Sequence, residues 1–263
     1  MKSYQLVATV FLAMAAGSMG IKNSAPVAQT LNGTIQGRHL AEFSQDLFLG
    51  IPFARAPRLN NPAPWNETYP RSAPFDASAY GPTCYGFGSN TMLNLTQSEE
   101  CLNLNIIRPA GLDSKAELPI LLWMYGGGWR QGSSADPMWN MSYIVAQSVA
   151  QKQPIIGVSV NYRLSFLGFP SSQEVLDAGV ANLGVKDQRA SFRWIKENIA
   201  AFGGDPSKLT IWVSDWPPIS AIMMPLLDFR LFHPYSHVVW SCSVFAPNYE
   251  VPVSRANQPG PPV

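Results

Sequence analysis

The sequence predicts an α/β fold, a largely parallel sheet with helices packed on both of its faces. Residues 119–125 and 155–162 are continuous apolar runs, as expected of strands that are buried on both sides. Residues 141–151 and 187–201 have helical character, and in the second stretch Phe192, Ile195 and Ile199 recur at helical spacing. Strands that alternate with helices in this way indicate a parallel sheet joined by crossover connections.

The first residues have the order of a secretory signal peptide. Lys2 precedes an apolar run over residues 6–16, and small residues follow. A membrane anchor is the alternative, but the run is shorter than the roughly 20 apolar residues that a bilayer span needs. We therefore expect residues 1–20 to be removed, the protein to be secreted into the extracellular space, and no stable membrane anchor.

The next segment predicts the antiparallel beginning of the sheet. Residues 32–48 alternate apolar and polar side chains around glycines, as a short meander does. Residues 50–80 are rich in Pro, Asn and Ser, which predicts an irregular surface excursion. Residues 102–107 predict a further strand that Pro109 closes.

The end of this organised region is also marked in the sequence. Asp187 is expected near the start of its helix, where a negative charge suits the exposed N–H groups. The run Gly203-Gly204-Asp205-Pro206 breaks the chain after that helix, and residues 209–212 begin a new strand.

Composition limits both the size of the fold and its partners. The chain has 263 residues, of which 46% are hydrophobic, enough for one core and too few for two independent domains. Its formal net charge of +1 gives no electrostatic reason to expect nucleic acid or an anionic membrane as a partner. No glycine-rich phosphate-binding pattern follows a strand, so nucleotide binding has no support.

Glycosylation sequons agree with export from the cell. Each is a candidate glycan acceptor on a surface loop. They begin at Asn32, Asn66, Asn94 and Asn140.

Export from the cell would place the cysteines in an oxidising compartment. Cys84 and Cys101 lie in one loop-like segment, and an oxidising compartment favours a bridge between them. By chain entropy, such a bridge would stabilise the fold by about 3 kcal/mol. Cys242 is left over. The sequence contains no paired CxxC and only three histidines, so we expect no metal and no cofactor.

One loop carries the clearest chemical signal. Gly126, Gly127 and Gly128 stand between Tyr125 and Trp129, directly after a buried apolar strand. Glycines let the backbone turn its N–H groups outward with no side chain in the way. A group of outward N–H groups is a ready site for a developing negative charge. The alternative is a plain flexible turn, and the position after the strand favours the anion site.

Several motifs occur in a fixed order along residues 30–212. They are Phe48-Leu49-Gly50-Ile51-Pro52-Phe53-Ala54, Tyr80-Gly81-Pro82-Thr83-Cys84, Ser98-Glu99-Glu100-Cys101-Leu102-Asn103-Leu104-Asn105, Tyr125-Gly126-Gly127-Gly128-Trp129, Asn161-Tyr162-Arg163-Leu164, Asn182-Leu183-Gly184-Val185-Lys186-Asp187-Gln188-Arg189-Ala190, Phe202-Gly203-Gly204-Asp205-Pro206 and Leu209-Thr210-Ile211-Trp212. In this order they resemble the type-B carboxylesterase, lipase and cholinesterase family of the α/β-hydrolase fold. The resemblance covers the N-terminal portion of that family's domain.

The resemblance implies roles for specific residues. Gly127 and Gly128 would supply two N–H groups of the oxyanion hole, for which the fold uses a glycine-rich loop at this place. Cys84 and Cys101 would form the family's first disulfide, and Arg163 and Asp187 a buried structural ion pair. The implied substrate is a small-molecule or lipid ester, and no protein partner is implied. A choline ester is not expected, because the segment between the two cysteines lacks the tryptophan of cholinesterases.

The resemblance ends where the nucleophile elbow should begin. In the family the strand runs into Gly-Glu-Ser-Ala-Gly, whose glycines permit the strained turn that presents the serine. Here Trp212 is followed by Val213-Ser214-Asp215-Trp216-Pro217, so Asp215 occupies the nucleophile position. The organisation is therefore expected to be a signal peptide over 1–20, the N-terminal part of the carboxylesterase domain over 21–212, and an unmatched proline-rich tail over 213–263.

The expected function follows from this pattern. The family hydrolyses carboxylic esters through an acyl-enzyme, but we expect this chain to be truncated before its serine, to lack the downstream acid and histidine, and to be inactive. A frameshift, a retained intron or genuine divergence would each give this sequence, and we favour the first two. The alternative is a secreted non-catalytic cholinesterase-like binding protein. A third hypothesis is that another chain supplies the missing half.

Overall fold

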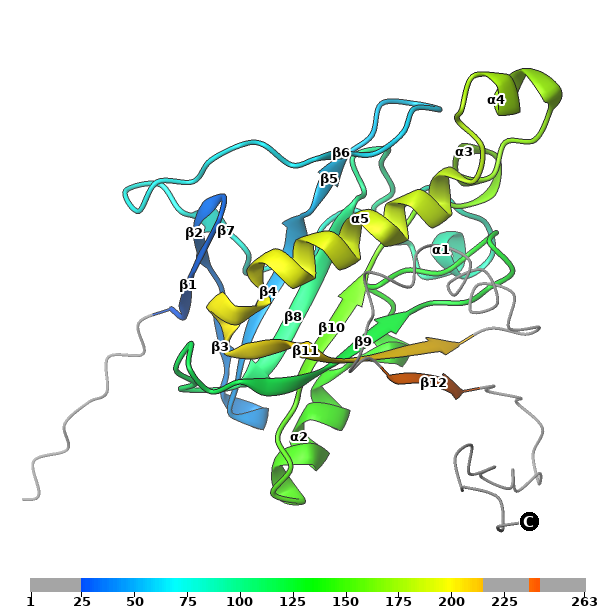
Figure 1. Cartoon of the computed structure of the whole chain (residues 1–263). Coiled ribbons are helices and arrows are strands. Elements are labelled where there is room, and N and C mark those ends of the chain that lie inside the picture. The colour runs from blue at the N-terminus through cyan, green and yellow to red at the C-terminus, as the bar shows by residue number, and fades with distance from the viewer. Residues whose placement is uncertain (1–24, 215–236, 242–263) are drawn as a thin grey trace, which may run out of the picture.

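A computed structural model describes residues 25–214 and 237–241 (Figure 1). Its centre is a seven-stranded sheet in which the strands lie in the order β12-β11-β9-β10-β8-β4-β3. In chain order the strands are β3 (Arg38–Leu40), β4 (Gln45–Pro52), β8 (Asn103–Pro109), β9 (Leu118–Met124), β10 (Ile156–Val160), β11 (Gly204–Ser214) and β12 (His237–Ser241). Each strand expected from the apolar runs is present.

The pairing of the strands divides the sheet into two halves. β10, β9, β11 and β12 pair parallel to one another, whereas β3, β4, β8 and β10 pair antiparallel. The predicted α/β class is confirmed, with the expected antiparallel strands at the N-terminal side. The described sheet is mixed, because β8 pairs antiparallel with β10 and so joins the antiparallel half to the parallel half.

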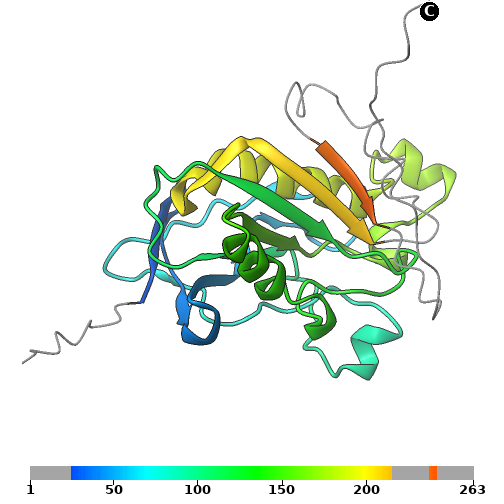
Figure 2. The ribbon, with the colours of Figure 1, turned by 90° about the horizontal axis from the view of Figure 1, so that it is seen from below.

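Helices cover both faces of the sheet, as predicted. Figures 1 and 2 show α5 (Leu183–Asn198) along one face and α2 (Ser142–Ala150) against the other. The short helices α1 (Ser89–Met92), α3 (Ser165–Gly168) and α4 (Gln173–Asp177) gather at the end of the sheet to which the arrowheads of β9, β10 and β11 point. The 3-10 helices are η1 (Ala41–Phe43), η2 (Pro137–Trp139) and η3 (Ile199–Phe202).

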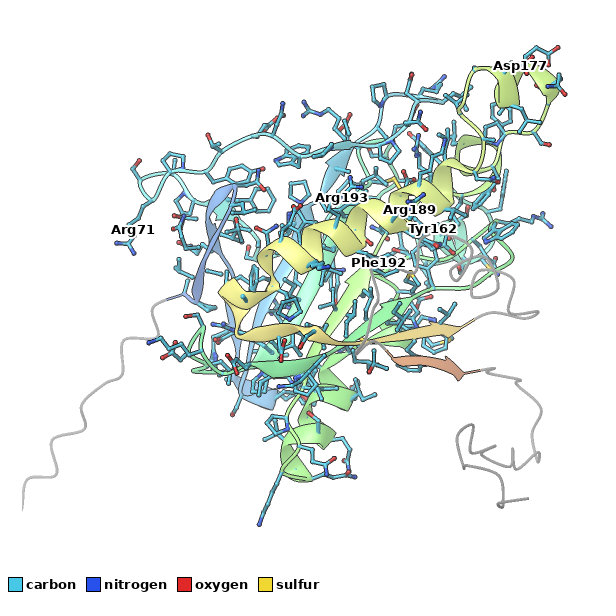
Figure 3. The ribbon with its side chains drawn as sticks, viewed as in Figure 1. Arg71, Tyr162, Asp177, Arg189, Phe192 and Arg193 are labelled. Atoms are coloured by element: carbon cyan, nitrogen blue, oxygen red, sulfur yellow. A yellow bond between two sulfur atoms is a disulfide. The ribbon has the colours of Figure 1, made fainter. Side chains whose placement is uncertain are left out.

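Alternate side chains along the strands fill two separate cores. Along β9, Leu122 and Met124 belong to the core beneath α5, whereas Trp123 belongs to the core beneath α2. The core beneath α5 also receives Phe192 from the helix, and Figure 3 shows this side chain on the side of α5 that faces the sheet, with Arg193 on the outer side. Burial on both faces explains why the strands have continuous apolar runs.

Small sheets flank the main one. β1 (Val27–Thr30), β2 (Gly33–Gln36) and β7 (Phe75–Asp76) form a three-stranded sheet, and β5 (Ala54–Arg55) pairs with β6 (Ala63–Pro64). Residues 50–80 are thus not irregular throughout, since they hold the end of β4 and the short strands β5, β6 and β7.

The second long helix differs from its prediction at both ends. α5 begins at Leu183 rather than at residue 187, and its continuation to Phe202 is the 3-10 helix η3. Asp187 therefore lies in the second turn of α5 and is fully buried, so it does not serve the exposed N–H groups at the helix start. Its partner is a side chain from a distant part of the sequence, Arg163.

Some predictions fall outside the described residues. They concern the signal peptide over 1–20, most of the tail over 213–263, Asp215 at the nucleophile position, and Cys242. Within residues 25–214 and 237–241, no helix is both long enough and apolar enough to cross a membrane. In the same residues, no group of His, Cys, Asp and Glu side chains is arranged to hold a metal ion.

Candidate active site

The glycine-rich loop begins where β9 ends, at the edge of the sheet that α1 and α3 also approach (Figure 1). Its backbone takes left-handed conformations, with φ of 98° at Gly127, 62° at Gly128 and 59° at Trp129. A Cβ atom at Gly127 would lie 2.5 Å from the carbonyl oxygen of Gln131, so only glycine fits there. At Gly128 a Cβ would meet no atom of the described residues within 4 Å.

The N–H groups of Gly127 and Gly128 are available to a ligand. Both residues are exposed, and neither N–H donates a hydrogen bond to any acceptor in the described part of the chain. Two unpaired N–H groups on consecutive residues in left-handed conformations provide a partial positive charge for an anionic oxygen. The assignment of these two groups to an oxyanion hole stays a prediction from the resemblance.

The remainder of the loop is held on two sides. The carbonyl oxygen of Trp129 accepts a hydrogen bond from the Ser165 N–H at 2.6 Å, and that of Arg130 accepts one from the Phe87 N–H at 2.9 Å. The Trp129 ring stacks on Phe169 with the ring centroids 4.6 Å apart. The loop is thus fixed by two segments remote in sequence, one ending in α1 and the other beginning α3.

Two tyrosines join the ends of the neighbouring strands β9 and β10. The Tyr125 hydroxyl donates to the carbonyl oxygen of Tyr162 at 2.7 Å and accepts from the Tyr162 N–H at 2.9 Å. The Tyr162 hydroxyl in turn donates to the carbonyl oxygen of Tyr125 at 2.7 Å. Burial raises the pKa of the Tyr125 phenol, so this hydroxyl stays protonated and keeps its donor role.

The structure brings Arg163 and Asp187 together in a buried ion pair. The guanidinium donates from Nη2 to Asp187 Oδ1 at 2.7 Å and from Nε to Oδ2 at 2.8 Å, and the Arg163 N–H also donates to Oδ2. Burial raises the pKa of the Asp187 carboxyl, while the hydrogen bonds from Arg163 oppose that rise. The pair ties the segment after β10 to α5.

The predicted disulfide is confirmed. Cys84 and Cys101 are bonded, with their Cα atoms 4.9 Å apart, and both are buried. The segment they enclose carries Asn90, which is fully buried and bonded to the far end of the glycine-rich loop. This contact is not predictable from the sequence, because nothing in a lone asparagine indicates a partner so far along the chain.

The strand that should carry the nucleophile ends beside the glycine-rich loop. In the register of β11 and β9, Val213 lies opposite Met124, two residues before Gly126. The described end of β11 therefore lies at the same edge of the sheet as the loop. Asp215 itself lies outside the described residues.

The sequons differ in their surroundings. Asn66 and Asn94 are exposed, as are the threonines of their sequons, Thr68 and Thr96. Asn32 is half-buried, and its side-chain Nδ2 donates to the carbonyl oxygens of Trp65 and Glu67 at 3.1 and 3.0 Å.

The fourth sequon is partly enclosed. The Oδ1 of Asn140 accepts a hydrogen bond from the Ser142 N–H at 3.0 Å, and Ser142 is fully buried.

Comparison with known proteins agrees with this geometry. Residues 24–215 match the model of the carboxylesterase family. The chain is 36% identical over 226 residues to Lipase 5 of Diutina rugosa, covering 76% of this chain and 40% of that protein. It is 39% identical over 191 residues to Secreted lipase 1 of Botryotinia fuckeliana, covering 64% of this chain and 32% of that protein. The chain thus spans less than half the length of these relatives.

Solved structures show the same architecture. A PNB esterase superimposes with a TM-score of 0.67 at 30% identity, over 81% of this chain and 42% of that one. Aspergillus niger EstA superimposes with a TM-score of 0.64 at 32% identity, over 76% of this chain and 37% of that one. The described fold is therefore the α/β-hydrolase fold.

Proposed function

Because the chain belongs to the carboxylesterase family, we propose that its glycine-rich loop is the oxyanion-holding part of a secreted carboxylic-ester hydrolase. The observation that carries the proposal is the pair of exposed N–H groups on Gly127 and Gly128 beside the end of β11. The N-terminal residues and the secreted relatives support an extracellular location.

The chemistry of such a site is acyl transfer. A serine at the elbow attacks the ester carbonyl, and negative charge develops on the carbonyl oxygen. The N–H groups of Gly127 and Gly128, with that of the residue after the nucleophile, would hold this oxygen. Donors already oriented toward the developing charge need no rearrangement during the reaction, and the loss of one such donor costs about 2.7–4 kcal/mol of transition-state stabilisation.

The residues after β11 do not supply the nucleophile. The elbow requires a serine flanked by small residues in a strained turn. This chain has Val213, Asp215 and Pro217 at the positions of the first glycine, the serine and the last glycine, and Pro217 has a fixed φ. We infer that the chain with this sequence has no triad-dependent turnover, although Gly127 and Gly128 are exposed in its glycine-rich loop.

Apolar side chains beside the loop favour a lipid ester over a small polar one. Phe87, whose N–H binds Arg130, is 62% exposed, and Phe166, which follows the Ser165 that binds Trp129, is 67% exposed. Met92 on α1 is 80% exposed. Exposed apolar groups gathered around one loop indicate an interaction surface for an apolar partner.

A fluorophosphonate probe tests the assignment at the nucleophile position. We expect the purified secreted chain to remain unlabelled, because the probe modifies the nucleophilic serine and Asp215 stands at that position. Stoichiometric labelling of a serine in the unaltered chain would contradict the inference. Sequencing the transcript across the codon of Trp212 tests whether the native gene encodes an active esterase. In that case we expect Gly-Glu-Ser-Ala-Gly to be encoded in another reading frame or exon.

The replaced elbow also favours the second candidate, a secreted binding protein without catalysis. That function requires a stable chain with the sequence as it stands. Monodisperse secretion with a cooperative thermal transition would support it. Aggregation, or absence from the medium, would favour a defective product.

A further inference from the structure

We propose that Asn90 is a positioning residue for the glycine-rich loop, and that through it the segment closed by the Cys84–Cys101 disulfide sets the orientation of the Gly127 and Gly128 N–H groups. The proposal deepens the proposed function, since it concerns the same loop and rests on its role as an oxyanion hole.

The side chain of Asn90 holds both backbone groups of one loop residue. Its Oδ1 accepts from the Gly132 N–H at 2.6 Å, and its Nδ2 donates to the Gly132 carbonyl oxygen at 2.9 Å. The same Nδ2 lies 3.1 Å from Thr83 Oγ1 and 3.2 Å from the carbonyl oxygen of Cys84. One fully buried amide thus joins the start of the disulfide segment to the end of the loop.

Fixing Gly132 also fixes Gly127, because the loop closes tightly on itself. Gly132 has φ of 119°, and a Cβ there would lie 2.4 Å from Tyr125 Cδ2, so its backbone packs against the residue that begins the loop. Gln131 precedes Gly132, and its carbonyl oxygen lies 2.5 Å from where a Cβ of Gly127 would be. Movement of Gly132 would therefore be transmitted to Gly127 through one residue.

The hydrogen bonds and the space around residue 90 suit an asparagine side chain. The contact needs an acceptor for the Gly132 N–H and a nitrogen whose two N–H groups are shared among the surrounding oxygen atoms, which an amide provides and a carboxylate does not. The space is also tight, because a Cβ at Gly86 would lie 3.1 Å from Asn90 Cγ. Gln131 adds a second connection between the segments, since its Oε1 accepts from the Ser89 N–H at 3.2 Å.

The test compares two buried asparagines of the full chain. Asn198 is the matched control, because its Nδ2 donates to the Trp194 carbonyl oxygen and its Oδ1 accepts from the Leu31 N–H, both far from the loop. The heteronuclear {1H}–15N NOE of the Gly127 and Gly128 amides is measured in ¹⁵N-labelled N90D and N198D. We expect N90D to lower both NOE values and N198D to leave them unchanged, at similar losses of thermal stability.

A second pair of variants covers the case in which N90D fails to fold. T83V removes the hydroxyl that Asn90 Nδ2 contacts, and T83S retains it. We expect T83V to lower the NOE of Gly127 and Gly128, and T83S to restore the native values. The proposal is overturned if folded N90D keeps native values, if N198D lowers them equally, or if T83V and T83S do not differ. None of these outcomes depends on serine labelling, so the proposed function and this inference can fail separately.

Discussion

The hydroxyl of Tyr125 is hydrogen-bonded to both backbone groups of Tyr162, accepting from its N–H at 2.9 Å and donating to its carbonyl oxygen at 2.7 Å. The two rings stack with centroids 4.4 Å apart. Tyr125 immediately follows β9, and Tyr162, which Figure 3 labels, lies just beyond β10. The contact thus holds the two strand ends from which the glycine-rich loop and the Arg163 segment depart.

Substitution of Tyr125 by phenylalanine tests this contact. Y125F removes the hydroxyl that bonds the buried N–H and carbonyl oxygen of Tyr162, and a typical intramolecular hydrogen bond contributes about 0.5–1.5 kcal/mol. We expect the free energy of unfolding in urea to fall by that amount. Y143F is the control, since Tyr143 is 66% exposed. Equal stability of the two variants would show that the hydroxyl of Tyr125 contributes nothing.

The buried ion pair makes a different prediction. R163M removes the guanidinium and leaves the buried Asp187 carboxylate with only the backbone N–H of residue 163, and breaking such a buried pair costs about 3–5 kcal/mol. The double variant R163M, D187L should be more stable than R163M, because an apolar pair leaves no buried charge.

Urea unfolding of the single and double variants checks this, with R58Q as the control. The Arg58 side chain is 70% exposed and pairs with Glu99, so its loss should cost less than about 1 kcal/mol. A double variant less stable than R163M would contradict the reasoning.

These two contacts show what the sequence could and could not predict. The apolar runs of β9 and β10 predict strands because a strand that is buried on both faces has an apolar side chain at nearly every position. The predicted start of α5 at residue 187 is wrong by four residues, because Asp187 is buried in the second turn of the helix. Its pairing with Arg163, 24 positions away, came from the resemblance and not from the local pattern. The contact of Asn90 with Gly132 could not be predicted, because the two residues lie 42 positions apart and no local sequence pattern indicates the contact.

Glycosylation should differ between two of the sequons. Asn66 is exposed. The Nδ2 of Asn32 donates to the carbonyl oxygens of Trp65 and Glu67, the two sequence neighbours of Asn66. A glycan on Asn32 would displace that amide, so we expect Asn66 to be modified and Asn32 to remain free.

Mass spectrometry of the secreted chain after enzymatic deglycosylation checks this. N66Q should remove one glycan and leave the stability unchanged. N32Q should leave the glycan mass unchanged and lower the free energy of unfolding by about 1–3 kcal/mol through lost hydrogen bonds. A glycan found on Asn32 would refute the structural role given to its amide.

Binding to a lipid surface tests the substrate class. Phe87 and Phe166 flank the glycine-rich loop and are largely exposed, and transfer of a phenylalanine side chain out of water is worth about 1.5–3 kcal/mol. We expect the full chain to bind phosphatidylcholine vesicles in a flotation assay. The double variant F87S, F166S should bind at least about tenfold more weakly, because about 1.4 kcal/mol corresponds to that factor.

The control must be an exposed apolar residue away from the loop. Leu31 is suitable, since it is 73% exposed and lies in the turn between β1 and β2, near the C-terminal end of α5. L31S should bind vesicles as the unaltered chain does. If L31S weakens binding as much as the double variant does, the binding is not specific to the loop. If the unaltered chain does not bind vesicles, the exposed phenylalanines contribute no affinity for lipid, and a small soluble ester is favoured as the substrate.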